Sequence, residues 1–118
     1  MNCLKVKKGF YVINLASETA HNGGTHWLSL YYSPENSFYF DPFGFISPKD
    51  VEKRIIPYTY SISQIQDINS TACGFYCIGF IIYMNLQKNK MEGFKTFVNH
   101  FSSDTKENDK KLYAFLYN

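Results

Sequence analysis

The chain has 118 residues, of which 45% are hydrophobic and 19% are aromatic, and its net charge is +2. This composition excludes a disordered chain and predicts one packed domain over residues 1–118, because two domains of this total length could not each bury a core. The small net charge gives no reason to expect binding to nucleic acid or to an anionic membrane surface.

The cysteines and the N-terminal residues indicate an intracellular protein. An odd number of cysteines, three in all, does not form the disulfide framework of a small secreted domain. Residues 1–10 lack the continuous apolar segment of a signal peptide, and the longest apolar stretch, residues 75–86, is too short to span a membrane. We therefore expect free thiols, no secretion and no membrane partner.

The first half of the chain predicts three strands. An aromatic and β-branched segment at 10–15 is followed by a polar loop that leads to His26. Residues 27–32 and 38–41 form a predicted hairpin around a turn at 33–36, in which Tyr32 faces Ser37 and Leu28 faces Asp41. This register places His26 diagonally opposite Asp41 on one face of the sheet.

The second half predicts four helices and one further strand. Ser47 is the expected cap of a short helix at 48–54, with Asp50 three residues later, and Pro57 closes it. Residues 58–65 alternate as a strand with Tyr58, Tyr60 and Ile62 on its buried face. Predicted helices then cover 70 or 71 to about 87, 91–101, and 105–117, where Asp104 is the expected cap of the last.

Cys73 is the candidate nucleophile. A cysteine reacts as its thiolate, which a helix N-terminus and a nearby imidazolium stabilise, and Cys73 falls in the first turn of the long predicted helix. Gly74 leaves room there for a substrate backbone. Cys77 lies one turn further on among large apolar residues, so we interpret it as core. A lone cysteine is more often a small buried hydrophobe, but the small and polar residues before Cys73 favour the catalytic interpretation.

His26 is the candidate base, because the sequence places an acid beside it. Neither His21 nor His100 has an acid positioned by any predicted pairing. Asp before Pro at a strand end is also a common turn residue, and Asp41 can fill both roles. Gln66 is the weakest assignment: its side-chain amide could donate to an oxyanion beside the backbone N–H of Cys73.

Four segments in order resemble the successive motifs of the adenovirus protease family, the adenains. These are residues 23–27 (GGTHW), 39–44 (YFDPFG), Gln66 seven residues before Cys73, and 69–77 (NSTACGFYC), and residues 112–116 are similar to the C-terminal helix of that family. The order His, acid, Gln, Cys is also that of proteases that process ubiquitin-like proteins. The likeness extends from about residue 10 to 117.

The resemblance implies a papain-like α+β fold, in which a central mixed or antiparallel sheet packs against the nucleophile-bearing helix and C-terminal helices. It implies cleavage of viral or mobile-element precursor proteins, within the host cell or virion. His26 is then the base, Asp41 the orienting acid, Gln66 the oxyanion donor and Cys73 the nucleophile. The family also uses a peptide or DNA activator.

Three features depart from the adenain pattern. Asp41 stands where the adenoviral enzymes have Glu, and only 25 residues precede His26. Residues 42–72 contain no cysteine, so the disulfide that tethers the adenoviral peptide cofactor has no partner at the corresponding place. A DNA or peptide activator is therefore not carried over to this chain.

Two alternatives share these residues. One is a deconjugating or processing protease for ubiquitin-like modifiers, and the other is an inactive relative that binds peptides or protein partners. No cofactor or metal is expected, because two cysteines four residues apart with no matched second pair do not complete a structural zinc site.

Overall fold

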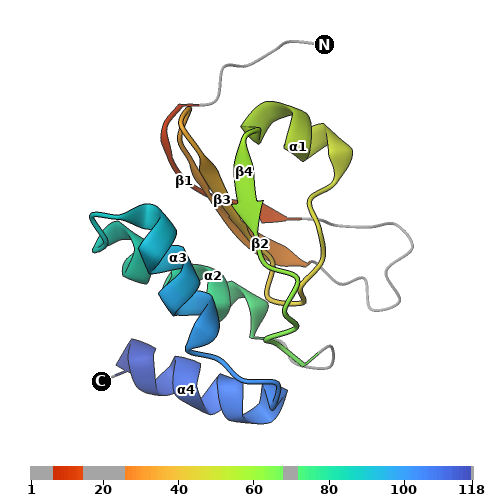
Figure 1. Cartoon of the computed structure of the whole chain (residues 1–118). Coiled ribbons are helices and arrows are strands. Elements are labelled where there is room, and N and C mark those ends of the chain that lie inside the picture. The colour runs from red at the N-terminus through yellow and green to blue at the C-terminus, as the bar shows by residue number, and fades with distance from the viewer. Residues whose placement is uncertain (1–6, 15–25, 68–71, 118) are drawn as a thin grey trace.

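The computed structural model is an α+β protein with one four-stranded sheet and four helices. It describes residues 7–14, 26–67 and 72–117. The strand order is β1-β2-β3-β4; β1 (Gly9–Asn14), β2 (Trp27–Tyr32) and β3 (Ser37–Phe40) are antiparallel neighbours, and β4 (Tyr58–Tyr60) runs parallel to β3. The predicted α+β class and the mixed sheet are confirmed (Figure 1).

The β2–β3 hairpin has the predicted register. Ser29 pairs with Phe40, Leu30 with Tyr39 and Tyr31 with Phe38, and the same spacing continues to Leu28 opposite Asp41. Residues 28–31 and 37–40 are buried on both faces of the sheet, so an alternation of buried and exposed side chains does not set this pairing; the length of the turn between the two strands does. The end of β3 is therefore held next to the beginning of β2.

The prediction of a strand over residues 58–65 is wrong beyond Tyr60. Tyr60 and Ile62, expected on the buried face, are 45% and 73% exposed. β3 ends at Phe40, so residues 61–66 have no strand to continue beside and pack instead against the turn that follows β3. The backbone N–H groups of Ile65 and Gln66 both donate to the carbonyl of Pro42, each at 2.9 Å.

Helix α1 (Lys49–Ile55) begins one residue later than expected, and Ser47 is not its cap. Pro48 occupies the cap position, and its carbonyl accepts hydrogen bonds from the N–H groups of Val51 and Glu52 at 3.0 and 2.9 Å. The Ser47 hydroxyl donates to the carbonyl of Pro48 at 3.1 Å, and the start of α1 has no side-chain cap.

Helix α2 (Cys73–Asn85) starts at the candidate nucleophile, and the expected helix start at residue 70 or 71 lies outside the described residues. At its other end the ammonium of Lys90 donates to the carbonyls of Met84 and Gln87, at 2.6 and 2.5 Å. A cation at this position stabilises the C-terminal end of the helix, where carbonyls lack helical partners.

Helices α3 (Lys90–Asn99) and α4 (Thr105–Tyr117) complete the layer beside α2. The apolar face of α3 packs into the core, where Phe94 and Phe97 are buried. The predicted cap of α4 is confirmed, because the Asp104 carboxylate accepts the N–H of Glu107 at 3.2 Å.

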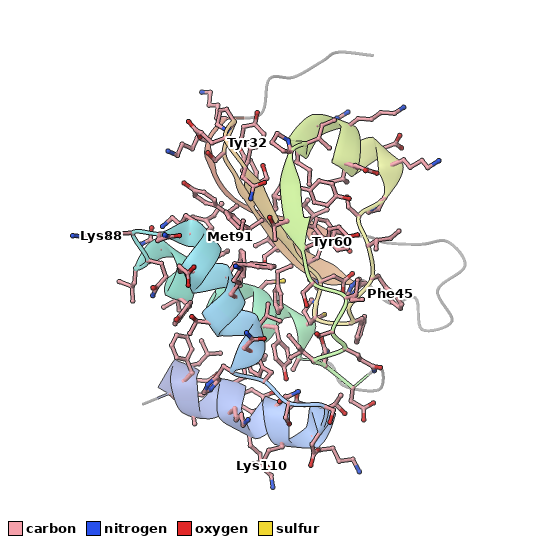
Figure 2. All side chains as sticks on the ribbon, viewed as in Figure 1. Tyr32, Phe45, Tyr60, Lys88, Met91 and Lys110 are labelled. Atoms are coloured by element: carbon pink, nitrogen blue, oxygen red, sulfur yellow. The ribbon has the colours of Figure 1, made fainter. Side chains whose placement is uncertain are left out.

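The sheet separates two apolar clusters. On one face Tyr31, Phe38 and Phe40 pack against α2 and α3; there the rings of Phe40 and Phe80 stack with centroids 5.3 Å apart. On the other face the core consists of Leu28, Leu30, Tyr39 and Ile55, with Ile55 contributed by α1. Side chains fill the space between the sheet and the helices in Figure 2. No helix in the described part of the chain is long and apolar enough to cross a membrane.

Candidate active site

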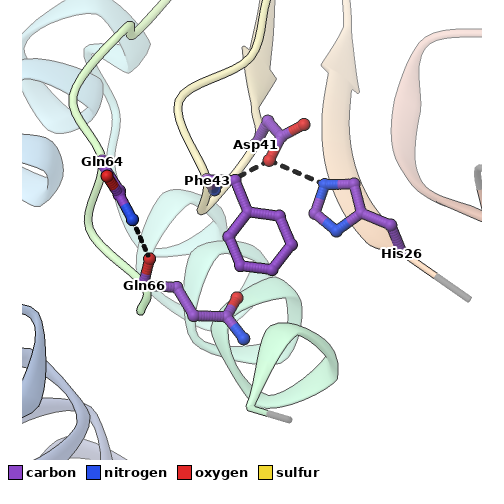
Figure 3. A network of polar contacts seen from close by, with 5 residues as sticks. All are labelled: His26, Asp41, Phe43, Gln64 and Gln66. Carbon is purple, nitrogen blue, oxygen red and sulfur yellow. Dashed lines mark hydrogen bonds and ion pairs between the residues drawn. The ribbon is translucent and has the colours of Figure 1, made fainter. Parts of the chain in front are cut away.

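An imidazole and a carboxylate meet at the end of the β2–β3 hairpin. The Nε2 atom of His26 lies 2.8 Å from Oδ1 of Asp41 (Figure 3). The Asp41 side chain is inaccessible to solvent, whereas that of His26 is 18% exposed. The contact expected from the hairpin register is therefore present, and it joins a buried acid to a ring that reaches the surface.

The turn after β3 holds the carboxylate in a fixed position. Oδ1 of Asp41 also accepts the backbone N–H of Phe43 at 2.8 Å, and the Asp41 carbonyl accepts the N–H of Gly44 at 2.8 Å. Gly44 has a φ of +82°, which favours glycine, and a Cβ there would lie 2.7 Å from the carbonyl oxygen of Ile62. Asp41 is thus both a turn residue and the partner of His26.

The His26–Asp41 contact determines which ring nitrogen can act as a base. A carboxylate accepts hydrogen bonds, so Nε2 must carry the proton, and Nδ1 of the neutral ring then carries the lone pair. Nδ1 is buried and has no hydrogen-bond partner among the described residues. The imidazole therefore presents a basic nitrogen on the side away from Asp41.

Cys73 is the first residue of α2, so it lies in the first helical turn, where the sequence predicted it. Its cap residue, Ala72, supplies no side-chain hydrogen bond, and the first turn contains no acidic residue. The positive end of the helix dipole is therefore not neutralised by α2 itself, and such a position stabilises a thiolate. Cys73 is 8% exposed, and a Cβ built on neighbouring Gly74 meets no atom of the described residues within 4 Å.

Cys77 lies in the core, as predicted. It is 1% exposed, and burial raises the pKa of its thiol from 9.0 to about 12. Burial outweighs a hydrogen bond with Ser29, which lowers this pKa, while Cys73 and Asp41 raise it further. A thiol with so high a pKa is protonated at neutral pH and is a poor nucleophile.

Gln66 is completely buried at the end of the segment that packs against the Asp41 turn. Its backbone N–H donates to Pro42, and its carbonyl accepts from the side chain of Gln64 at 3.2 Å. In Figure 3 its side-chain amide and the His26–Asp41 pair lie on opposite sides of the Phe43 ring. The backbone of Gln66 is therefore held close to the Asp41 carboxylate, because it is hydrogen-bonded to Pro42, the residue that follows Asp41.

The two other histidines do not form a comparable pair in the described residues. His21 lies outside them, and His100 is exposed at the end of α3, where its carbonyl accepts a hydrogen bond from Lys111 at 3.1 Å. No group of three or more His, Cys, Asp or Glu side chains gathers as a metal site within residues 7–14, 26–67 and 72–117.

Sequence analysis assigns no role to Phe43, although its ring stacks on that of His26. The two ring centroids are 4.4 Å apart and the planes are inclined by 19°. The residue enters the sequence analysis only as part of the 39–44 segment. Its position could have been predicted from the sequence spacing: Phe43 follows Asp41 by two residues, and in an Asx-turn the residue at that spacing donates its N–H to the Asp side chain.

Comparison with known proteins finds relatives among viral proteases. The chain is 32% identical to the protease of Bovine adenovirus 2, in a match covering 65% of this chain and 46% of that protein. It is 29% identical to the protease of Bovine adenovirus C serotype 10 and 30% identical to that of Bovine adenovirus B serotype 3; each match covers 59% of this chain, and 45% and 44% of the relative. The chain thus spans about half the length of these relatives. No protein-family model matches the sequence.

Proposed function

We propose that this chain, which is related to the adenovirus proteases, carries the catalytic centre of a cysteine-type endopeptidase. The observation that supports this most directly is the hydrogen bond between His26 and Asp41, because it leaves Nδ1 as the basic nitrogen. The helix that begins at Cys73 supplies the thiol. The proposal is papain-like in that the nucleophile lies at the start of a helix and the base lies next to a strand of the sheet.

In the proposed reaction Nδ1 of His26 takes the proton of the Cys73 thiol, and the sulfur attacks the peptide carbonyl carbon. The negative charge on the carbonyl oxygen is stabilised by the backbone N–H of Cys73 and the side-chain amide of Gln66. The tetrahedral intermediate collapses when its C–N bond breaks and His26 gives its proton to the leaving amine. Asp41 stabilises the imidazolium throughout.

In the second half of the reaction, hydrolysis of the thioester releases the acid product. His26 takes a proton from water, the resulting hydroxide attacks the thioester carbonyl, and the C–S bond breaks as the proton returns to sulfur. Because the relatives are viral proteases, we propose that the substrates are viral precursor proteins. The same chemistry could act on conjugates of ubiquitin-like modifiers, and the two uses differ only in the polypeptide bound.

Labelling with a peptide carrying a thiol-reactive group would test the proposed nucleophile. The probe should label Cys73 rapidly, and the His26→Gln variant should reduce the rate by a factor of about 10² or more, since the base that forms the thiolate is lost. The Cys77→Ala variant is the matched control and should still be labelled at Cys73. Equal, slow labelling of all cysteines would contradict the proposal and favour an inactive, peptide-binding relative.

Cleavage of a peptide library by the same protein would define the substrate. Cys73→Ser should abolish cleavage while the circular dichroism spectrum is unchanged. Cleavage within viral precursor peptides would support the proposal, whereas cleavage only after the terminal Gly-Gly of modifier conjugates would replace it with the deconjugating activity.

A further inference from the structure

We infer that Phe43 is a positioning residue for the catalytic imidazole, acting through its ring on His26 and through its backbone on Asp41. This inference rests on the proposed function, because it assigns the residue that keeps the proposed base in its working orientation. Phe43 makes both contacts itself: its ring stacks on His26 at 4.4 Å, and its N–H donates to Oδ1 of Asp41 at 2.8 Å.

One hydrogen bond does not fix an imidazole ring. The bond between Nε2 of His26 and Oδ1 of Asp41 fixes one atom of the ring, but the ring can still pivot about the line joining these two atoms. Such a pivot moves Nδ1, which is the atom that must meet the thiol. An aromatic ring lying nearly parallel to the imidazole, at an interplanar angle of 19°, opposes that motion.

The stacked ring also favours the charged form that the reaction requires. An aromatic face within about 6 Å attracts a cation, so Phe43 stabilises the imidazolium that forms when Cys73 loses its proton. Asp41 stabilises the same charge from the edge of the ring. The two residues thus act on different parts of the imidazole, one on its face and one on Nε2.

The Asp41 turn keeps the Phe43 ring in place. Its shape depends on the positive φ of Gly44 and on the carbonyl of Pro42, which accepts the N–H groups of Ile65 and Gln66. The ring of Phe45, with its centroid 6.1 Å from that of Phe43 and 6.5 Å from that of His26, borders the pair edge-on. Phe45 is 55% exposed and lies at the rim of the structure in Figure 2.

Kinetic comparison of three variants tests the positioning role. Phe43→Leu keeps an apolar side chain and the backbone N–H but removes the flat ring, so kcat should fall about 10- to 100-fold while KM changes less than about 3-fold. Phe43→Tyr should restore most of kcat. Phe10→Leu is the matched control, since Phe10 is also half-buried and packs on an aromatic ring, that of Tyr31, at 4.8 Å near the other end of the hairpin.

A second measurement does not require any activity. In the parent protein the Nε2 proton of His26 should give an imidazole ¹H–¹⁵N signal; it should be broadened by exchange in Phe43→Leu and retained in Phe43→Tyr and Phe10→Leu. Absence of proteolysis together with this pattern would reject the proposed function but support the positioning role. Unchanged kcat in Phe43→Leu, or a sharp Nε2 signal in that variant, would overturn the inference.

Discussion

Four consecutive residues, 41–44, supply most of the fixed geometry at the candidate site. Asp41 binds His26, Pro42 accepts two backbone hydrogen bonds from the segment that ends in Gln66, and Phe43 covers the imidazole. Gly44 allows the close approach that makes this packing possible. The site therefore depends on backbone conformation at one turn as much as on the chemistry of its side chains.

Gly44→Ala should be strongly destabilising. The φ of +82° is unfavourable for alanine, and a Cβ would lie 2.7 and 2.8 Å from the carbonyl oxygens of Ile62 and Ser63, which belong to the backbone and cannot rotate away. We expect the free energy of unfolding to fall by about 2–4 kcal/mol, measured by urea denaturation. Gly74→Ala is the control: its Cβ meets no atom within 4 Å in the described part of the chain, so stability should be unchanged or slightly higher.

The two described cysteines should differ in reactivity although they are one helical turn apart. The pKa of the Cys77 thiol is raised to about 12, so the thiolate is scarce at pH 8. Iodoacetamide at that pH should modify Cys73 and leave Cys77 unmodified until the protein unfolds, as measured by mass spectrometry of tryptic peptides. Rapid modification of Cys77 in the folded protein would show that it is not buried.

At the scale of elements, one fully buried asparagine joins three segments. The Nδ2 group of Asn108, on α4, donates to the carbonyls of Ile65 and Ser102 at 2.9 and 2.7 Å, and Oδ1 accepts the N–H of Ser102 at 2.8 Å. Ile65 immediately precedes Gln66. Helix α4 thereby holds in place the segment that contains Gln66, the proposed oxyanion donor.

Asn108→Ala should lower both stability and activity. The substitution leaves three backbone groups without this partner, of which the carbonyl of Ile65 is in a buried hydrogen bond, and we expect a loss of about 1–3 kcal/mol in thermal or urea denaturation. Asn85→Ala, an exposed substitution at the end of α2, should cost less than about 1 kcal/mol. If kcat also falls at a temperature where the Asn108→Ala protein is still folded, the link from α4 to Gln66 is functional; equal stability of the two variants would contradict the proposed role.

The elements that the sequence predicted well are those with strong local signals. The turn at 33–36 predicted the β2–β3 register, and with it the His26–Asp41 contact. The alternation of residues 58–65 was a weaker signal: β3 ends at Phe40, so none of the described strands lies beside residues 61–65. Tertiary packing therefore overrode the local pattern.

The buried polar contacts could not be predicted in the same way. Asn108 lies 43 residues from Ile65 in sequence, and nothing in its local pattern distinguishes it from an exposed residue of an amphipathic helix.

The outer face of α2 could not be predicted either, because this helix is apolar on all sides. Its side chains Phe75, Ile78 and Ile82 are 39–48% exposed, while those one or two positions away are buried.

Considered as a whole, the molecule buries several groups that ionise only in alkali. Burial raises the pKa of Cys77 to about 12, and it also raises the pKa of Tyr39 and Tyr76 above their ordinary value of 10.0. For Tyr76 the hydrogen bond that its hydroxyl donates to Asp109, at 2.7 Å, raises the pKa further. These groups come from β3 and α2, so their ionisation would affect the contact between the sheet and the helices.

Stability should therefore decline as the pH rises above about 9. A group whose pKa is higher in the folded than in the unfolded state binds more protons when folded, so its contribution is complete below the unfolded value, 9.0 for Cys77, and is lost as the pH rises toward about 12. The unfolding free energy measured at intervals from pH 8 to 11 should fall with a slope that is shallower in Cys77→Ala. Tyr60→Phe changes an exposed tyrosine and should leave the slope unchanged; an identical slope in Cys77→Ala would show that this thiol does not contribute.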